Sequence, residues 1–185
     1  MHIHTISAYE TSAEEFFKRL VDWKVDLVVD TRLKNTNQLA GFTKKNDLAY
    51  FVPKLLHADY VHDKLFAPAP TMMERYIHGN IGWDAYADAY REDMREREAV
   101  PQFFDRYGDC ESVALVGTAT RSRRSHVEVL AEMLEEFQKE QGGNSPVVLI
   151  ERKHSTVRCT VELPSTRSER REAPRSGDAK DPVRR

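Results

Sequence analysis

Asp30 and Arg32 end a short β-branched run, and a polar loop follows them. Such a run predicts a buried strand, and open α/β sheets place their ligand chemistry where strands end. The two residues are two apart on a strand, so their side chains face the same side and suit a carboxylate base or acceptor beside an anion-binding guanidinium. An internal ion pair is the alternative. We favour a functional site because the loop is rich in polar donors, among them Asn35, Gln38 and Lys44.

A second group of candidates lies in the segment 117–126, which joins a predicted strand to a long helix. The first N–H groups of a helix point outward and carry positive potential, which favours the binding of an anion. Arg121, Arg124 and Ser125 add donors suited to phosphate or carboxylate. In the alternative interpretation Ser122 or Ser125 caps the helix and the arginines lie in solvent. His62, which ends the third predicted strand, is a candidate for proton transfer, and a hydrogen-bonded packing histidine explains it equally well.

The elements that position these candidates follow from the apolar spacing and the capping signals. The expected order begins with a strand over 2–7, a helix after the capping box at 12–15, a strand over 27–30, a helix over 45–56 and a strand over 60–62. Helices follow within 70–107, and they include a short one over 102–107. The remaining elements are a strand over 112–116, a helix over 122–141, a strand over 147–151 and an antiparallel edge strand over 157–163. This alternation predicts a three-layer α/β fold, Rossmann-like or flavodoxin-like. Its sheet is mostly parallel with about five strands, and a helical insertion covers about 70–107.

The length of 185 residues and the hydrophobic content of 40% fit one domain, which we expect over 1–163. Residues 164–185 have almost no apolar side chains, so we expect a disordered tail there. The tail is basic, with seven Lys and Arg against four Asp and Glu, so it carries +3 and the rest of the chain −5. The formal net charge of −2 gives no overall electrostatic case for a nucleic-acid partner.

Cys110 and Cys159 stand far apart, with neither a CxxC spacing nor a nearby pair of histidines. This spacing argues against a structural zinc and gives no disulfide framework. We therefore expect no metal, no cofactor and a location in the reducing cytoplasm. The amino-terminal residues lack a basic region followed by an apolar one, and no apolar run approaches the roughly 20 residues that span a bilayer. We expect neither secretion nor a membrane partner.

The same residues carry a family resemblance. The chain resembles the family of domain of unknown function 488 (DUF488) over about residues 2–151, and the resemblance rests on Asp30-Thr-Arg32, on the run Gln38-Leu-Ala-Gly-Phe-Thr-Lys-Lys45, on Tyr60-Val-His62 and on Ile81-Gly-Trp83. The run from Gln38 to Lys45 is specific to one branch of the family. The resemblance implies a small cytoplasmic α/β domain from a prokaryote, without an established activity.

The sequence departs from the family pattern after the first strand, where Ser7 takes the place of a family glycine, and at two further places. The family has a cysteine at the end of the fourth strand and a Cys-His-Arg triplet that opens the next helix. Gly117 stands near the first position and Ser122-Arg123-Arg124 takes the place of the triplet, so only Arg124 is carried over. If the family cysteines bind a metal or react, this chain cannot do the same. If they only shape an anion pocket, serine and arginine can still do so.

These observations predict a cleft that binds a phosphate-bearing or otherwise anionic ligand, either a nucleotide or nucleic acid. An enzyme would use Asp30 or His62 for proton transfer and Arg32 with Arg124 for charge stabilisation, in hydrolase or transferase chemistry on a nucleotide-like substrate. A binding module without a reactive centre is the second class, which the missing cysteines favour slightly. The third class is an adaptor that docks a protein partner through the aromatic side chains of the helical insertion.

Overall fold

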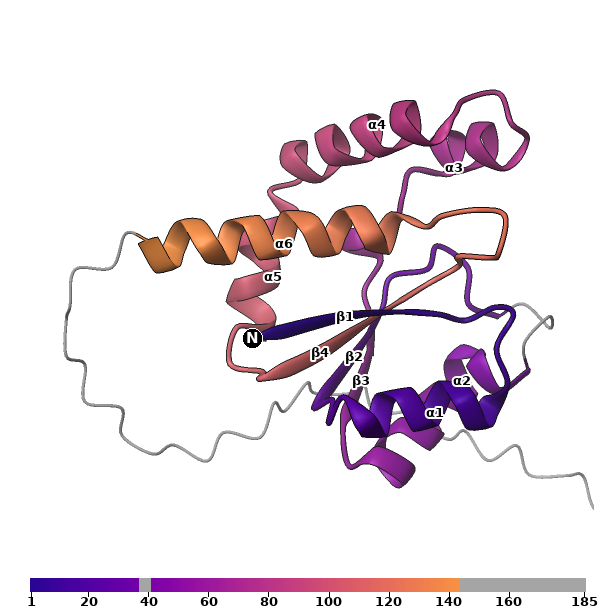
Figure 1. The fold of residues 1–185 in the computed structure, drawn as a ribbon, viewed down its shortest axis with the longest axis vertical. Helices are drawn as coiled ribbons and strands as arrows, with labels where there is room; N and C mark the ends of the chain where they lie inside the picture. Colours follow the sequence, from indigo (N-terminus) through magenta and orange to yellow (C-terminus); the bar gives the residue numbers. More distant parts are fainter. Residues whose placement is uncertain (37–40, 144–185) are drawn as a thin grey trace, which may run out of the picture. The chain divides into compact units, whose positions relative to one another are not determined.

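Four parallel strands form the sheet at the centre of the fold (Figure 1). The computed structural model describes residues 1–36 and 41–143. The strands are β1 (His2–Ser7), β2 (Leu27–Asp30), β3 (Asp59–His62) and β4 (Ser112–Gly117). Their order is β1-β4-β2-β3, and every neighbouring pair is parallel. The α/β class and the parallel pairing expected from the sequence are therefore confirmed.

Burial explains why the inner strands are easy to find in the sequence. All residues of β2 and β4 are buried, because these strands have neighbours on both sides and helices on both faces. Strands in such a position read as continuous apolar runs. The edge strands differ: Ile6 is the one buried residue of β1, and β3 has none.

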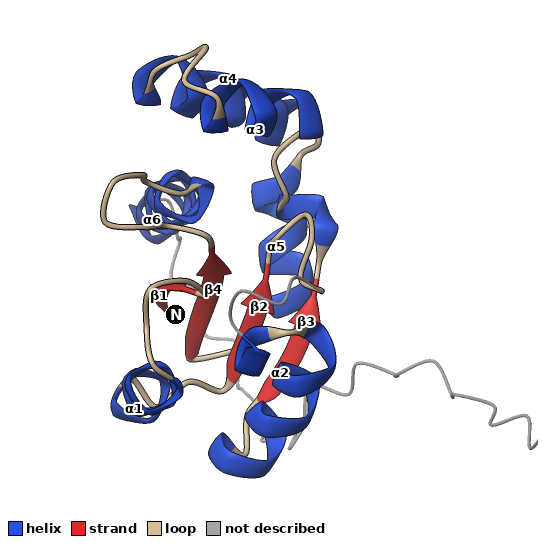
Figure 2. Cartoon of the chain, turned by 90° about the vertical axis from the view of Figure 1, so that its right-hand side faces the viewer, coloured by secondary structure: helices blue, strands red, loops and turns tan. Residues whose placement is uncertain are grey.

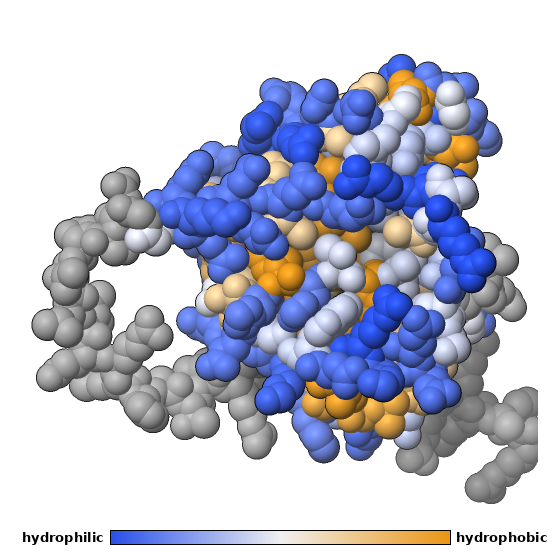
Figure 3. Space-filling view, in the orientation of Figure 1, coloured by the Kyte–Doolittle hydropathy of each residue, from blue (hydrophilic) through white to orange (hydrophobic). Residues whose placement is uncertain are grey.

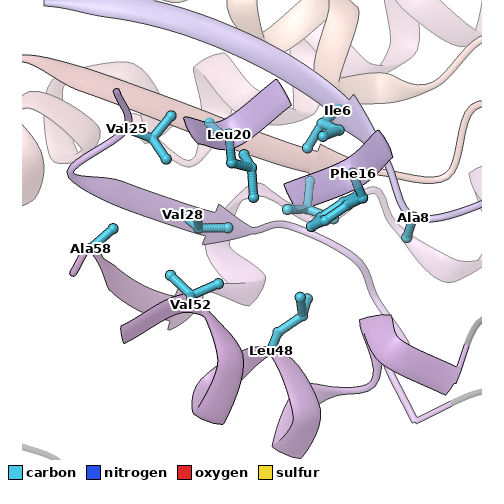
Figure 4. Packing of buried hydrophobic residues seen from close by; sticks show 11 residues of the cluster. Ile6, Ala8, Phe16, Leu20, Val25, Val28, Leu48, Val52 and Ala58 are labelled. Carbon is cyan, nitrogen blue, oxygen red and sulfur yellow. The ribbon is translucent and has the colours of Figure 1, made fainter. Parts of the chain in front are cut away.

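Two helices, α1 (Ala13–Asp22) and α2 (Lys45–Phe51), cover one face of the sheet (Figure 2). The capping box predicted at the start of α1 is formed on one side, since the Ser12 hydroxyl accepts the Glu15 N–H at 3.1 Å. Phe16 and Leu20 point from α1 into the core that Figure 4 shows. The single helix predicted over 45–56 is instead α2 followed by a π-helical turn (Val52–Leu56), which includes Pro53.

The opposite face of the sheet is covered by α5 (Ala99–Tyr107) and α6 (His126–Gly143), so the described elements form the three layers expected (Figure 2). The insertion also contains α3 (Pro70–Ile77) and α4 (Trp83–Glu96), and α4 packs on α6. Helical structure over 70–107 is confirmed. The short helix expected over 102–107 is α5, which begins at Ala99. It includes Pro101, because proline is tolerated in the first turn of a helix.

Aromatic side chains hold the insertion together. Tyr76 of α3 stacks on Tyr86 of α4 with ring centroids 4.3 Å apart, and Trp83 contacts both rings. Tyr86 and Tyr90 are buried, and the Tyr90 hydroxyl donates to the carbonyl of Phe66 at 2.7 Å. Most of this aromatic set therefore forms the interior of the insertion and not its outer surface.

The start of α6 differs from the expected position. The sequence spacing suggested Ser122, but the helix begins at His126. The backbones of Thr120 and Arg123 bond to each other in a tight turn, which keeps the preceding residues out of the helix. The Glu128 carboxylate then accepts the Ser125 N–H at 3.0 Å, as in a capping box that begins at Ser125.

Gly117 ends β4 in close contact with the residues at the start of α6, and it leads to a stability prediction. A Cβ atom at this position would lie 2.6 Å from Ser125 Oγ and 2.6 Å from Val127 Cγ2. Overpacking of this kind costs about 1–3 kcal/mol, so we expect Gly117→Ala to lower the free energy of unfolding by that amount in urea titrations. Gly82→Ala is the control, because a Cβ atom there meets no neighbour within 4 Å. Equal effects of the two substitutions would contradict the prediction.

Several expectations fall outside the described residues and stay predictions. They are the strand over 147–151, the edge strand over 157–163, the basic tail over 164–185 and the site residue Gln38.

Candidate functional site

A pocket of about 480 Å³ opens at the carboxyl edge of the sheet, and we call it the edge pocket. The helices that follow β2 and β4 lie on opposite faces of the sheet (Figure 2), and neighbouring strands whose connections diverge in this way leave a crevice at their ends. All four strands contribute residues that follow them. The lining consists of Tyr9 after β1, Arg32, Leu33 and Lys34 after β2, Lys64 after β3, Thr118 after β4, His126 at the start of α6, and Pro68, Pro70, Met73, Glu74 and Ile77 in or before α3.

Asp30 and Arg32 form a buried ion pair behind this pocket. The Arg32 Nε donates to Asp30 Oδ1 at 2.8 Å, and Nη2 donates to Oδ2 at 2.7 Å, so the pair is bidentate. Arg32 is 3% exposed and Asp30 is fully buried. The same Nη2 also donates to the carbonyl of Thr43 at 2.5 Å, which holds the guanidinium in one orientation.

Three further donors complete the surroundings of Asp30. Its oxygens accept the Asn35 side-chain amide at 3.0 Å, the Tyr60 hydroxyl at 2.8 Å and the Arg32 N–H at 3.2 Å. Burial alone raises the pKa of Asp30, but the hydrogen bond and charge of Arg32, with the bonds from Asn35 and Tyr60, hold that pKa below its usual value. With both oxygens occupied by protein donors, the geometry favours the internal ion pair over a catalytic base.

His62 lies on the same network but outside the lining of the edge pocket. Its Nε2 is 2.9 Å from the carbonyl oxygen of Arg32. A carbonyl only accepts, so this nitrogen carries the proton and donates it. His62 therefore ties β3 to the residues after β2, which is the packing role that the sequence left open for it.

His126 is a site residue that the sequence analysis did not single out. Its Nε2 is 2.9 Å from the Thr31 hydroxyl, which itself donates to the carbonyl of Val116 at 3.0 Å. Because the Thr31 proton is used in that bond, His126 must donate from Nε2, and Nδ1 accepts from the Ser125 hydroxyl at 3.3 Å. Burial lowers the pKa of His126 to about 4, so the ring is neutral at pH 7 and joins β2, β4 and α6.

Two of the predicted donors in the segment 117–126, the side chains of Arg124 and Ser125, form contacts within the protein. Arg124 stacks over the ring of Trp83 at 4.2 Å and pairs with Glu128 at 2.7 Å. The carboxylate of Glu128 therefore lies at the start of α6, which is the place where the sequence predicts an external anion. The hydroxyl of Ser125 is buried and accepts the Thr118 N–H at 3.1 Å. Arg121 is exposed, and its backbone N–H donates to the Glu10 carboxylate at 2.5 Å.

The lysines divide into two groups. Lys44 precedes the first residue of α2 and does not line the edge pocket. Lys34 and Lys64 do line it, are exposed, and form no ion pair within the described part of the chain. Neither lysine is among the candidates that the sequence predicts, because they belong to loops 30 residues apart that only the fold brings to one pocket. The signal that was present is their position directly after predicted strands.

Residues 1–36 and 41–143 contain neither a metal-binding cluster nor a helix that could cross a membrane. Those residues contain no group of three or more His, Cys, Asp or Glu side chains that could hold a metal ion. The helices they form include none with the length and apolar character that crossing a membrane requires.

Comparison with known proteins identifies the family. Neither the curated proteins nor the solved structures contain a match to the chain. The family described as Domain of unknown function DUF488 matches residues 12–134, which is more than half of the 185 residues. That range contains β2, β3, β4, the whole helical insertion and most lining residues of the edge pocket. The protein therefore belongs to the DUF488 family.

Proposed function

We propose that the protein binds a small anionic ligand, with a phosphate or a carboxylate group, in the edge pocket. The observation that carries this proposal is the charge of the lining. Arg32 is neutralised by Asp30, whereas Lys34 and Lys64 form no ion pair with any acid of residues 1–36 and 41–143, and Glu74 is the single acid among the lining residues. Two uncompensated ammonium groups at the rim of a crevice attract an anion and bond to it.

The position of the pocket supports the same proposal. Parallel α/β sheets bind their ligands at the carboxyl ends of the strands, where the connections diverge. The volume of about 480 Å³ lies within the range of small-molecule sites, roughly 300–1,000 Å³. It suits a small molecule better than a polymer, and the negative charge of residues 1–163 also disfavours nucleic acid.

Binding is better supported than catalysis. The candidate catalytic groups Asp30 and His62 donate or accept within the protein, and both nitrogens of His126 are used as well. The adaptor alternative depended on an aromatic surface of the insertion. Tyr86 and Tyr90 are buried, so that alternative has less support.

The proposal predicts which lysines bind the anion. Inorganic phosphate should raise the melting temperature in a saturable way, because it binds the folded state alone. A charge-assisted hydrogen bond contributes about 1.5–3 kcal/mol, so Lys34→Met and Lys64→Met should each weaken phosphate binding about tenfold or more. Lys54→Met is the matched control, because Lys54 is exposed and lies outside the edge pocket. Failure of phosphate to bind, or equal binding by all three variants, would refute the proposal.

A further inference from the structure

The helix α3 presents one complete face to the edge pocket. Pro70, Met73, Glu74 and Ile77 all line the pocket, and their spacing of i, i+3, i+4 and i+7 places them on one side of the helix. Three of the four are apolar. The wall that α3 forms is therefore an apolar stripe with one carboxylate in it.

A neighbouring side of α3 is already occupied. Tyr76 stacks on Tyr86 and contacts Trp83, which fixes α3 against α4. At the edge of the pocket face, Met73 Sδ also lies 3.8 Å from the Tyr86 hydroxyl, but α3 contains no buried residue and Ile77 is 44% exposed. The packing on α4 fixes the position of α3, and the apolar face toward the pocket stays exposed. Such a face gains stability when an apolar group covers it.

The remaining lining residues add the charge complement. Tyr9 and Leu33 extend the apolar surface, and Lys34 and Lys64 supply two cations that pair with no acid in the described part of the chain. A ligand that satisfies both parts needs an anionic group and an apolar body. Inorganic phosphate has only the first.

We propose that the ligand of the edge pocket is a ring-bearing anion of the nucleoside monophosphate class, whose phosphate bonds to Lys34 and Lys64 and whose ring covers the stripe of Met73 and Ile77. This inference rests on the proposed function. The carboxylate of Glu74 decides between a ring and an acyl chain. A nucleobase or a sugar carries N–H and O–H donors for it, whereas an acyl chain would desolvate Glu74 without a partner.

The test compares four probes on the full chain by calorimetry. Adenosine 5′-monophosphate should bind at least about tenfold more tightly than inorganic phosphate, adenosine or octanoate, since covering one large apolar side chain is worth about one factor of ten. Ile77→Ser should weaken the nucleotide by about tenfold and leave phosphate unchanged. Val21→Ser is the matched control, because Val21 is a 55% exposed apolar residue of α1 that lies outside the edge pocket. Apolar surface is also exposed near the bottom of the view in Figure 3, in the region of α1 and α2.

A second readout protects the test against variants that perturb folding. Hydrogen exchange of the parent protein should slow in residues 70–77 when the nucleotide is added, and remain unchanged with phosphate. If phosphate binds through the lysines but the nucleotide binds no more tightly, or octanoate binds equally well, the ligand class is wrong and the proposed function stands. If neither phosphate nor the nucleotide binds, both are wrong.

Discussion

Asp30→Ala is expected to lower the free energy of unfolding by about 3–5 kcal/mol, the usual cost of removing one partner from a buried ion pair. Arg32 is only 3% exposed in the parent protein, and the substitution leaves its guanidinium with no carboxylate beside it. It also removes the acceptor of the Asn35 amide and the Tyr60 hydroxyl. Urea denaturation at pH 7 measures the loss.

The matched control for this substitution is Asp22→Ala. Asp22 also pairs with a cation, Lys18, but that pair lies on the exposed side of α1. Exposed pairs contribute little, so the control should change stability only slightly. The double variant Asp30→Ala with Arg32→Met should regain part of the loss, because it no longer buries an unpaired charge. The ion-pair interpretation fails if Asp30→Ala costs no more than Asp22→Ala.

The ion pair also illustrates what the sequence could predict. The β-branched run before Asp30 identified a buried strand, and the two-residue spacing placed Asp30 and Arg32 on the same side of it. Both inferences depend only on local geometry. The choice between a functional pair and an internal one depends on Asn35, Tyr60 and Thr43, which come from three other segments. No local pattern reports those contacts.

The start of α6 was missed for a different reason, because its signal is present in the sequence. Ser125 and Glu128 have the spacing of a capping box, and an apolar helix pattern follows them. The expected helix over 122–141 begins instead at Ser122, which has no acidic residue three positions later, although Ser125 is one of the two capping residues that the sequence offers. The error moved the helix start by four residues and concealed His126, which links α6 to β2 through Thr31.

The edge pocket itself was beyond prediction from local patterns. Its position at the strand ends follows from the α/β class. Its apolar wall depends on where α3 lies, and that is decided by the stacking of Tyr76 on Tyr86 and by the packing of α4 on α6. The strand order β1-β4-β2-β3 is equally non-local, because the insertion carries the chain from β3 past β2 to β4. That order places β3 beside β2, so that Lys64 after β3 lines the same pocket as the residues after β2.

The remaining large effect concerns pH, and it follows from the burial of His126. The pKa of this ring falls from 6.5 to about 4 in the folded protein. Between these values the unfolded chain binds a proton that the folded protein does not bind, so stability falls as pH falls from 6.5 to about 4. A shift of this size corresponds to a loss of about 3 kcal/mol across the window. Below about pH 4 both states are protonated, and this contribution stays constant.

Asp30 titrates in a separate window. Its pKa is lowered from 3.8, so its contribution is present above that value and is lost only at lower pH. His4 contributes in the same direction as His126, since burial also lowers its pKa, but it is retained in every variant compared. The difference between the parent and His126→Gln therefore isolates His126.

We expect the free energy of unfolding of the parent to drop between pH 6.5 and 4, and that of His126→Gln to follow a flatter curve. The variant is less stable at pH 7, because glutamine cannot donate to Thr31 and accept from Ser125 in the same geometry. The two curves should approach each other toward pH 4, where the parent has lost the advantage of a neutral ring. Urea titrations at half-unit intervals of pH measure both. Parallel curves would mean that His126 is protonated in the folded protein as readily as in the unfolded chain, and then the neutral link between β2 and α6 does not exist.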